Sequence, residues 1–531
     1  MLSEGNFALS PDGQSLITQE VVPEVPVSWE TLYPPPFASF PFRIRVGHEF
    51  AGNPVRQYVR INLQTGSVQS LMDAPVSASA GWHSGLTGSP RWSSDGQAIL
   101  LPGSFLHSKD QVPSRPCVAV VDLSSNTRTC VELLRGQTEA GFEEGYHFVS
   151  DARFIEGDKH RVMVSFKTHP EDQAGNTEYR STADGTWEVV AQGKKEYQVG
   201  HNGLEIAVDE AFDRAPVLVA KEKELSRVIW DPNPQLKDFD LGQTSLYTWK
   251  DKVGRDWRGL LFKPSNPRSG QRYPLVIQTH GFSESLFIPS GRYPTAYAAR
   301  ELAAADMVVL QVEEGACIYS GIPSEAPCGV SGYEAAAKQL VSEGLVDPQR
   351  VGIIGFSRTC LHVMEALTTG ALHLKAASIT DGVMANYLQY MLEVDSWGNA
   401  HARNYDSVIG AKPFGEGLQQ WLKLSPLFRL DQVRTPLLVV GEGPFSLLFM
   451  WEPYAGLRYL QKPVDLIMLN TSEHILTNPA VRLASQGGTV DWFRFWLKDE
   501  EDSNPAKAAQ YERWRELRKM QQANENKLAT P

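Results

Sequence analysis

The chain has 531 residues, of which 42% are hydrophobic and 21% are charged, and its formal net charge is −12. A chain of this length and composition can bury the cores of two large domains. The acidic balance, together with the lack of a basic stripe, excludes a general nucleic-acid-binding protein. No stretch of sequence approaches the roughly 18 to 20 apolar residues that a membrane-spanning helix needs.

The N-terminal sequence Met-Leu-Ser-Glu-Gly-Asn-Phe lacks the basic segment and the apolar segment of an export signal. As written, the chain is expected in the cytoplasm. If an N-terminal export signal is missing from the sequence, the periplasm is the expected compartment.

Four of the five cysteines fall into two pairs with spacings that permit disulfides. Cys117 and Cys130 flank a predicted hairpin, and Cys317 and Cys328 bracket a loop rich in Gly and Pro. Four buried thiols in a reducing compartment fit the same spacings equally well. The sequence leaves both interpretations open.

Residues 1–235 have the pattern of repeated antiparallel strands. Asp-Gly hairpin turns occur within 10–13, 93–96 and 183–185, and alternating strands that end in turns cover 59–66 and 118–125. This pattern predicts three or four blades of a β-propeller. Because a closed propeller has about four to eight blades, we expect an incomplete one, with a missing N-terminal part as the favoured explanation.

Residues 236–500 follow a Pro-rich linker and alternate strands with helices, which predicts a doubly wound, mostly parallel sheet. The expected strands after an initial hairpin are Leu275–Gln278, Met307–Val312, Val351–Phe356, Ala376–Thr380, Pro436–Val440 and Val464–Leu469. The expected helices are Gly332–Glu343, Thr359–Thr369, Trp451–Leu460 and Pro479–Lys498. Residues 501–531 are expected to form a surface helix over Ala506–Gln522 and a disordered tail.

Ser357 is the candidate nucleophile. It lies between the apolar strand ending at Phe356 and the following helix, in a sequence that matches G-x-S-x-G except at its last position. That motif builds a sharp strand-to-helix turn that exposes the serine Oγ. Thr359 replaces the last glycine, and a buried serine in an ordinary turn remains the alternative interpretation.

The other two members of a catalytic triad are expected after later strands, in the order nucleophile, acid, histidine. Glu442 follows the strand Pro436–Val440, and His474 follows the strand Val464–Leu469. A histidine that accepts the serine proton, oriented by a carboxylate, makes the hydroxyl nucleophilic. We therefore predict the triad Ser357, Glu442 and His474.

Three other acids are candidates for the carboxylate. Glu452 is the main rival to Glu442, because it lies at the start of a predicted helix ten residues later. Glu473 is too close in sequence to turn back onto the ring of His474. Asp381 follows the strand Ala376–Thr380, which is not the strand expected to carry the acid.

The oxyanion hole is expected to use backbone N–H groups at two places. Arg358 directly follows the nucleophile, and Gly281 and Phe282 follow an early strand, next to His280, whose ring is interpreted as structural. No cluster of His and Cys has the spacing of metal ligands, and no Gly-rich loop predicts a phosphate site. We expect neither a metal nor a cofactor.

The chain resembles the prolyl oligopeptidase family of serine peptidases over residues 240–500. The resemblance rests on Val346–Ile353 before the nucleophile, on His280-Gly281-Phe282, on Ser425-Pro426 before 435–438, and on Asp491-Trp492-Phe493. It implies a β-propeller followed by an α/β-hydrolase domain.

Two departures point to one branch of that family. Thr359-Cys360 stand where the family has glycines, and Glu442 stands near the position of the family's usual Asp. With Trp230–Pro234 and Tyr511–Arg518, these features resemble the lasso peptide isopeptidases, which hydrolyse the isopeptide bond that closes the ring of a threaded lasso peptide. The resemblance implies a peptide substrate and a Ser357, Glu442 and His474 triad. An oligopeptidase for short linear peptides and an inactive propeller-hydrolase used as a binding module remain the alternatives.

Overall fold

The computed structural model contains two compact units, residues 1–199 with 393–401 and residues 200–392 with 402–531. The structure describes residues 7–22, 26, 28–29, 55–77, 89–106, 115–134, 137–138, 141–142, 147–168, 174–193, 204–223, 225–265, 267–313, 315, 321–397, 399–471 and 473–529.

The N-terminal part consists of successive antiparallel sheets, as expected for propeller blades. The first sheet contains β1 (Ala8–Leu9), β2 (Ser15–Val21), β3 (Arg56–Asn62) and β4 (Val68–Ser70). The second contains β5 (Arg91–Trp92), β6 (Ala98–Phe105), β7 (Pro116–Asp122) and β8 (Thr127–Leu133). The third contains β11 (His147–Ile155), β12 (Asp158–Thr168), β13 (Ala174–Ser181) and β14 (Trp187–Gly193), and a short hairpin of β9 (Gln137–Thr138) and β10 (Gly141–Phe142) precedes it.

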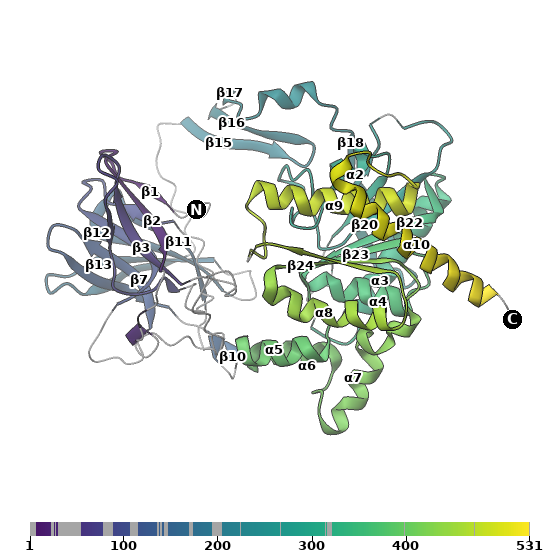
Figure 1. Cartoon of the computed structure of the whole chain (residues 1–531). Helices are drawn as coiled ribbons and strands as arrows, with labels where there is room; N and C mark the ends of the chain where they lie inside the picture. The colour runs from purple at the N-terminus through teal and green to yellow at the C-terminus, as the bar shows by residue number, and fades with distance from the viewer. Residues whose placement is uncertain are drawn as a thin grey trace. The chain divides into compact units, whose positions relative to one another are not determined.

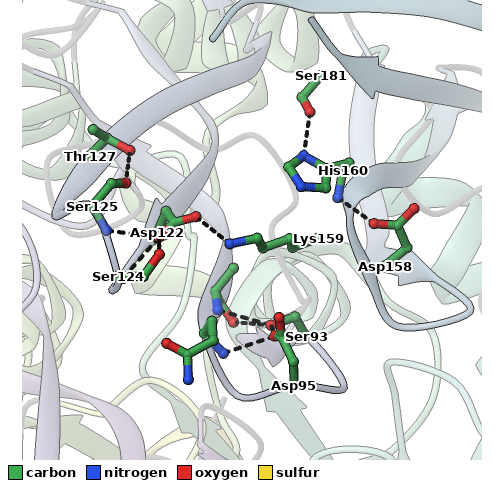
Figure 2. A network of polar contacts seen from close by, with 12 residues as sticks. Ser93, Asp95, Asp122, Ser124, Ser125, Thr127, Asp158, Lys159, His160 and Ser181 are labelled. Carbon is green, nitrogen blue, oxygen red and sulfur yellow. Dashed lines mark hydrogen bonds and ion pairs between the residues drawn. The ribbon is translucent and has the colours of Figure 1, made fainter. Parts of the chain in front are cut away.

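Polar contacts between turns join the second and third sheets (Figure 2). Lys159 lies at the start of β12 and Asp122 at the end of β7, and Lys159 Nζ donates to Asp122 Oδ2 at 2.8 Å. The Ser94 N–H donates to the carbonyl of Gly157 at 3.0 Å, and a Cβ at Gly157 would lie 2.5 Å from the Cβ of Ser94. Glycine is therefore required where these two turns meet.

A further sheet of β15 (Leu204–Ala211), β16 (Arg214–Glu222) and β17 (Leu225–Trp230) belongs to the second unit. The turn between β15 and β16 is hydrogen-bonded to residues 284–287 of the same unit. Phe212 N–H donates to the Glu284 carbonyl at 3.2 Å, and Phe287 N–H donates to Glu210 Oε2 at 2.8 Å. The structural division therefore falls near residue 200, although the β-rich sequence continues to Trp230.

The second unit is built on one sheet of eight strands in the order β18-β19-β21-β20-β22-β23-β24-β25. The strands are β18 (Gln243–Lys250), β19 (Asp256–Lys263), β20 (Tyr273–Gln278), β21 (Val308–Val312), β22 (Val346–Phe356), β23 (Ala376–Thr380), β24 (Leu437–Glu442) and β25 (Val464–Leu469). β18 and β19 pair antiparallel, and the six strands β20 to β25 run parallel to one another. The carboxyl ends of the parallel strands therefore lie at one edge.

Helices cover both faces of this sheet (Figure 1). On one face, α3 (Glu325–Ser342), α4 (Cys360–Thr369) and α8 (Gly443–Tyr459) share a buried core with the strands. On the other face, α2 (Ala299–Ala304), α9 (Pro479–Lys498) and α10 (Ala508–Ala529) pack around Trp492 and Trp514. Further helices are α5 (Tyr387–Trp397), α6 (Asn399–Ile409) and α7 (Leu418–Leu424), and there are short 3₁₀ turns η2 (Pro234–Asp238), η3 (Ser357–Thr359), η4 (Gly415–Gly417), η5 (Pro426–Gln432) and η6 (Pro505–Lys507).

The structure differs from the expectation for the C-terminal segment and decides between the two interpretations of one cysteine pair. α10 continues past Gln522 to Ala529, where a disordered tail was expected. Cys117 and Cys130 are free thiols, which is one of the two interpretations that the sequence left open for this pair. Cys328 is disulfide-bonded, and the Cys317 proposed as its partner lies outside the described residues.

Within the described residues, no helix combines the length and the apolar character needed to cross a membrane.

Candidate active site

The sequence around Ser357 folds into a sharp strand-to-helix turn. β22 ends at Phe356, Ser357 adopts a left-handed φ of 50°, and α4 begins three residues later. A Cβ at Gly355 would lie 2.8 Å from Val363 Cγ2, so the first glycine of the motif allows α4 to pack against the strand. A strained φ at a non-glycine residue is typical of a functional turn that its surroundings hold in place.

Thr359 occupies the last glycine position of the motif without disrupting the turn. Its side chain is fully buried, and its Oγ1 donates to the Phe356 carbonyl at 2.8 Å and accepts from Thr279 Oγ1 at 2.6 Å. The hydroxyl thereby bonds the turn to β22 and to the end of β20. A β-branched residue is accommodated here because its polar atom has partners.

The small residue that the turn needs lies instead at Gly382, after β23. A Cβ on Gly382 would lie 2.1 Å from Cys360 Sγ and 2.3 Å from the Ser357 carbonyl oxygen. The Val383 N–H also donates to that carbonyl at 3.0 Å. The glycine therefore makes room for the side chain of Cys360 at the start of α4.

Ser357, His474 and Asp381 form a continuous hydrogen-bonded chain. His474 Nε2 lies 2.9 Å from Ser357 Oγ, and His474 Nδ1 lies 2.6 Å from Asp381 Oδ2. With Asp381 ionised, Nδ1–H donates to the carboxylate, and the lone pair on Nε2 faces the hydroxyl. This arrangement can activate the serine for attack on a carbonyl carbon.

Packing fixes the ring of His474 while leaving part of it accessible. The ring stacks on Phe356, with centroids 4.7 Å apart and planes 23° apart, and half of the His474 side chain is exposed. The ring of His280 packs against the same aromatic group: its centroid is 4.5 Å from that of Tyr293 and 6.0 Å from that of Phe356. The His280 ring therefore belongs to the buried packing next to the site.

Asp381 is the acid that contacts His474 directly in the structure. The sequence had predicted Glu442 for this contact. Glu442 Oε2 is 3.9 Å from His474 Nδ1, beyond hydrogen-bond distance, whereas Asp381 is at 2.6 Å. Setting Asp381 aside because of its strand was wrong. β23 lies between β22 and β24, so a residue that follows it at the carboxyl edge lies between Ser357 and Glu442.

The two carboxyl groups have opposite protonation tendencies. Burial raises the pKa of Asp381, but the hydrogen bond and charge of His474 more than offset this, so the pKa of Asp381 falls below its usual value. Burial and the charge of the neighbouring Asp381 raise the pKa of Glu442 to about 12. At neutral pH Asp381 is the ionised member of this pair.

The other acids that the sequence analysis considered point elsewhere. Glu452 Oε2 accepts a hydrogen bond from the Leu388 N–H at 3.3 Å, and burial raises the pKa of Glu452. Glu473 accepts from both the N–H and the hydroxyl of Thr477, at 2.8 and 2.7 Å. The prediction that Glu452 could replace Glu442 at the histidine has no support in these contacts.

One of the three predicted oxyanion-hole donors is already engaged. The Gly281 N–H donates to the Val312 carbonyl at 2.9 Å, so the prediction for Gly281 is wrong: this N–H belongs to the bonding between β20 and β21. The N–H groups of Phe282 and Arg358 remain the predicted donors. Arg358 lies in the first turn after the nucleophile, where N–H groups lack intrahelical partners.

The side chain of Arg358 anchors the turn in a buried ion pair that the sequence analysis did not identify. Arg358 Nε and Nη2 donate to the two oxygens of Glu325 at 2.8 and 3.0 Å. Glu325 Oε1 is also 3.3 Å from His362 Nε2, and His362 Nδ1 is 3.2 Å from the Tyr333 hydroxyl. This cluster ties the residue after the nucleophile to the start of α3.

Apart from Asp381, Glu442 and His474, the described part of the chain gathers no three His, Cys, Asp or Glu side chains with the spacing of a metal site.

The sequence is similar to a known protein family and to known proteins. Residues 329–500 match the model of the prolyl oligopeptidase family. The chain is 28% identical over 323 residues to the lasso peptide isopeptidase AtxE2 of Asticcacaulis excentricus, a match that covers 57% of this chain and 44% of that protein. It is 23% identical over 299 residues to the acylamino-acid-releasing enzyme of Mus musculus, covering 52% and 39%. The chain thus spans less than half the length of the curated relatives it matches.

Solved structures support the fold over nearly the whole chain. An AtxE2 isopeptidase structure with Astexin3-dC4 bound is similar with a TM-score of 0.57 and 18% identity, covering 98% of this chain and 97% of that one. The acylaminoacyl peptidase of Pyrococcus horikoshii is similar with a TM-score of 0.55 and 16% identity, covering 94% and 90%. These likenesses establish a propeller followed by an α/β-hydrolase domain, as the sequence predicted.

Proposed function

We propose that this chain, whose residues 329–500 match the model of the prolyl oligopeptidase family, hydrolyses amide bonds in peptides through an acyl-enzyme on Ser357. The observation that carries the proposal is the hydrogen-bonded chain from Ser357 Oγ through His474 to Asp381, at 2.9 and 2.6 Å. Reacting groups already within hydrogen-bond distance are the geometric requirement for this chemistry.

The reaction would proceed in two steps on this geometry. Ser357 Oγ attacks the carbonyl carbon while its proton passes to His474 Nε2, and the imidazolium is stabilised by Asp381. The oxyanion is met by the N–H of Arg358 and a second donor, for which Phe282 is the candidate. The imidazolium then protonates the leaving amine, and a water molecule, activated by the same histidine, releases the acyl group.

The finer proposal is that the amide bond is the isopeptide bond of a lasso peptide macrocycle. It is supported by the 28% identity to a lasso peptide isopeptidase and by the two sequence departures at Thr359 and Glu442. The likeness to acylamino-acid-releasing enzyme keeps an alternative open, namely cleavage of short linear peptides with the same catalytic group.

The substrate is tested by incubating the protein with a threaded lasso peptide, with its unthreaded ring form and with the linear peptide of the same sequence. Isopeptide hydrolysis yields one linear chain that has gained a single water, and tandem mass spectrometry then reads the sequence without a break. Cleavage confined to the linear peptide would overturn the lasso proposal and favour the oligopeptidase. Labelling of Ser357 by a fluorophosphonate excludes an inactive binding module, and the Ser357→Ala protein is the control.

A further inference from the structure

A pair of buried threonine hydroxyls joins the two segments that are predicted to supply the oxyanion hole. Thr279 directly follows β20 and leads to Phe282, and Thr359 directly follows Arg358 in the turn of the nucleophile. Thr279 Oγ1 lies 2.6 Å from Thr359 Oγ1, although the two residues are 80 positions apart in the chain. Both side chains are fully buried.

The hydroxyl bonds run in one direction, so that each proton has an acceptor. The Tyr297 hydroxyl is 3.2 Å from Thr279 Oγ1, which donates to Thr359 Oγ1. Thr359 Oγ1 in turn donates to the Phe356 carbonyl at 2.8 Å. Thr279 Oγ1 is also 2.9 Å from the Ile354 carbonyl, which already accepts from the Thr279 N–H at 3.2 Å. Buried hydroxyls with this many partners are fixed in position.

The segment that leads to Phe282 is held at a second point. The Gly281 N–H donates to the Val312 carbonyl at 2.9 Å. His280 and Gly281 both have left-handed φ values, 76° and 85°, and such a conformation at a non-glycine residue persists only where its surroundings hold it. The position of the Phe282 N–H therefore depends on Thr279 and Gly281, which precede it.

The ion pair of Arg358 does not make this connection. Its guanidinium bonds to Glu325 at the start of α3, which fixes the side chain of Arg358 to a helix. The hydroxyl of Thr359 instead bonds the residue after Arg358 to the residue after β20. The two threonines thus connect the turn of Arg358 to the segment of Phe282.

We propose that Thr279 and Thr359 form a hydroxyl clamp that sets the separation of the Arg358 and Phe282 N–H groups, so that both threonines are positioning residues. A developing oxyanion is stabilised when both donors point at one oxygen, and a misplacement of about 1 Å can cost about 10² in rate. The glycine of the G-x-S-x-G motif has no side chain that could reach Thr279. The proposal rests on the proposed function for its catalytic meaning.

The first test compares kcat in the wild type, Thr359→Val, Thr359→Ser and Thr279→Val. Val keeps the branched shape without the hydroxyl, and we expect Thr359→Val to lower kcat by about 10–10²-fold with little change in KM. Ser keeps the hydroxyl and should retain most of the wild-type kcat. Thr279→Val breaks the same bond from the other side and replaces Thr359→Val as the test if that protein does not fold. The double Val variant should lose no more than the weaker single variant, because one shared bond is broken in each.

Thr435→Val is the matched control. Thr435 is buried, and its Oγ1 donates to the Leu374 carbonyl at 2.9 Å. Both residues precede parallel strands, β24 and β23, so this bond lies at the edge of the sheet opposite to Ser357. The control therefore loses a hydroxyl bond of the same kind, and we expect lower stability with an unchanged kcat.

A peptidyl trifluoromethyl ketone measures the oxyanion hole without turnover. Ser357 Oγ adds to the ketone carbon and its proton passes to His474, so the former carbonyl oxygen becomes the oxyanion of a hemiketal. We expect the pKa of this hemiketal, followed by ¹⁹F NMR, to be about one unit higher in Thr359→Val, since one unit corresponds to a ten-fold loss in stabilisation of the anion. Thr359→Ser and Thr435→Val should keep the wild-type pKa.

The clamp would be overturned by a wild-type kcat and hemiketal pKa in Thr359→Val, by equal losses in Thr359→Val and Thr359→Ser, or by an equal loss in Thr435→Val. If the wild type hydrolyses no peptide, the proposed function fails, while the hemiketal pKa still decides the clamp. A wild type that forms no hemiketal would overturn both.

Discussion

Two buried glutamates flank the nucleophile, and their surroundings give them opposite charge states. Glu325 receives two hydrogen bonds from Arg358 and lies 3.3 Å from His362, so although burial favours its neutral form, these partners bring its pKa to about 2. Glu442 is buried to a similar degree beside another acid, and its pKa rises to about 12. Partners, rather than depth, decide the charge of a buried carboxyl.

The two histidines of these clusters differ in the same way. His362 is fully buried, and burial lowers its pKa despite the nearby Glu325, so it remains a neutral member of a satisfied network. His474 is half exposed and bonds on one side to an acid and on the other to the serine. The cluster of Glu325, Arg358 and His362, in which charges are paired, holds the turn in place. The accessible cluster around His474 is arranged to transfer a proton.

The largest effect is expected when the hydroxyl of Ser357 is removed from the cluster around His474. Ser357→Ala should lower turnover by about 10⁶, because the members of such a relay act as a unit. Steady-state kinetics on a peptide substrate measures the loss. A variant with turnover close to the wild type would remove Ser357 from the mechanism.

Removing the charge of Glu325 from its ion pair with Arg358 should destabilise the fold. Glu325→Gln leaves the buried Arg358 charge without its partner, which typically costs about 3–5 kcal/mol in the free energy of unfolding. Denaturant titration measures the change. The matched control is Glu516→Gln in the exposed pair with Lys519, where about 0–1 kcal/mol is expected. Similar losses in both variants would show that Arg358 does not depend on Glu325.

The two glutamates should also respond to pH with opposite signs. A folded state that keeps Glu442 protonated binds one more proton than the unfolded state above pH 4.5, so this group makes the free energy of unfolding fall by about 1.4 kcal/mol per pH unit as pH rises. Glu442→Gln removes that contribution. The difference in unfolding free energy, variant minus wild type, should therefore grow between pH 6 and pH 8.

Denaturant titrations of both proteins across this range measure the difference. Because the pKa of Glu325 is lowered, its stabilising contribution is present above its unfolded pKa and is lost only as pH falls toward about 2. A pH-independent gap between the wild type and Glu442→Gln would mean that Glu442 is ionised in the folded protein.

The smallest predicted effect concerns the packing between the two clusters. Gly382→Ala places a Cβ 2.1 Å from Cys360 Sγ, and overpacking of this kind costs about 1–3 kcal/mol. The control is Gly487→Ala inside α9, where a Cβ meets nothing within 4 Å and should stabilise the helix by about 0.5–1 kcal/mol. Thermal denaturation of both variants separates close packing from helix propensity; destabilisation of equal size in both would contradict the packing argument.

The fold of the second unit was readable in the sequence because local patterns carry it. The strands Ala376–Thr380 and Val464–Leu469 and the helix Pro479–Lys498 have the predicted bounds. α8 begins at Gly443, well before the predicted Trp451, and carries Pro453 in its interior. A proline inside a helix contradicts local propensity, so tertiary packing, including that against β24 and β25, is needed to account for that helix.

The sequence by itself predicted Ser357 and His474, because a nucleophile and a histidine after particular strands follow from chain order. The choice between Asp381 and Glu442 depended on tertiary structure. Chain order favoured Glu442, but both acids lie at the carboxyl ends of neighbouring parallel strands and reach the same edge of the sheet. A difference of about 1 Å in distance to one nitrogen, and the burial of one carboxyl beside the other, separate their roles. Such differences arise only when side chains from distant parts of the chain pack together.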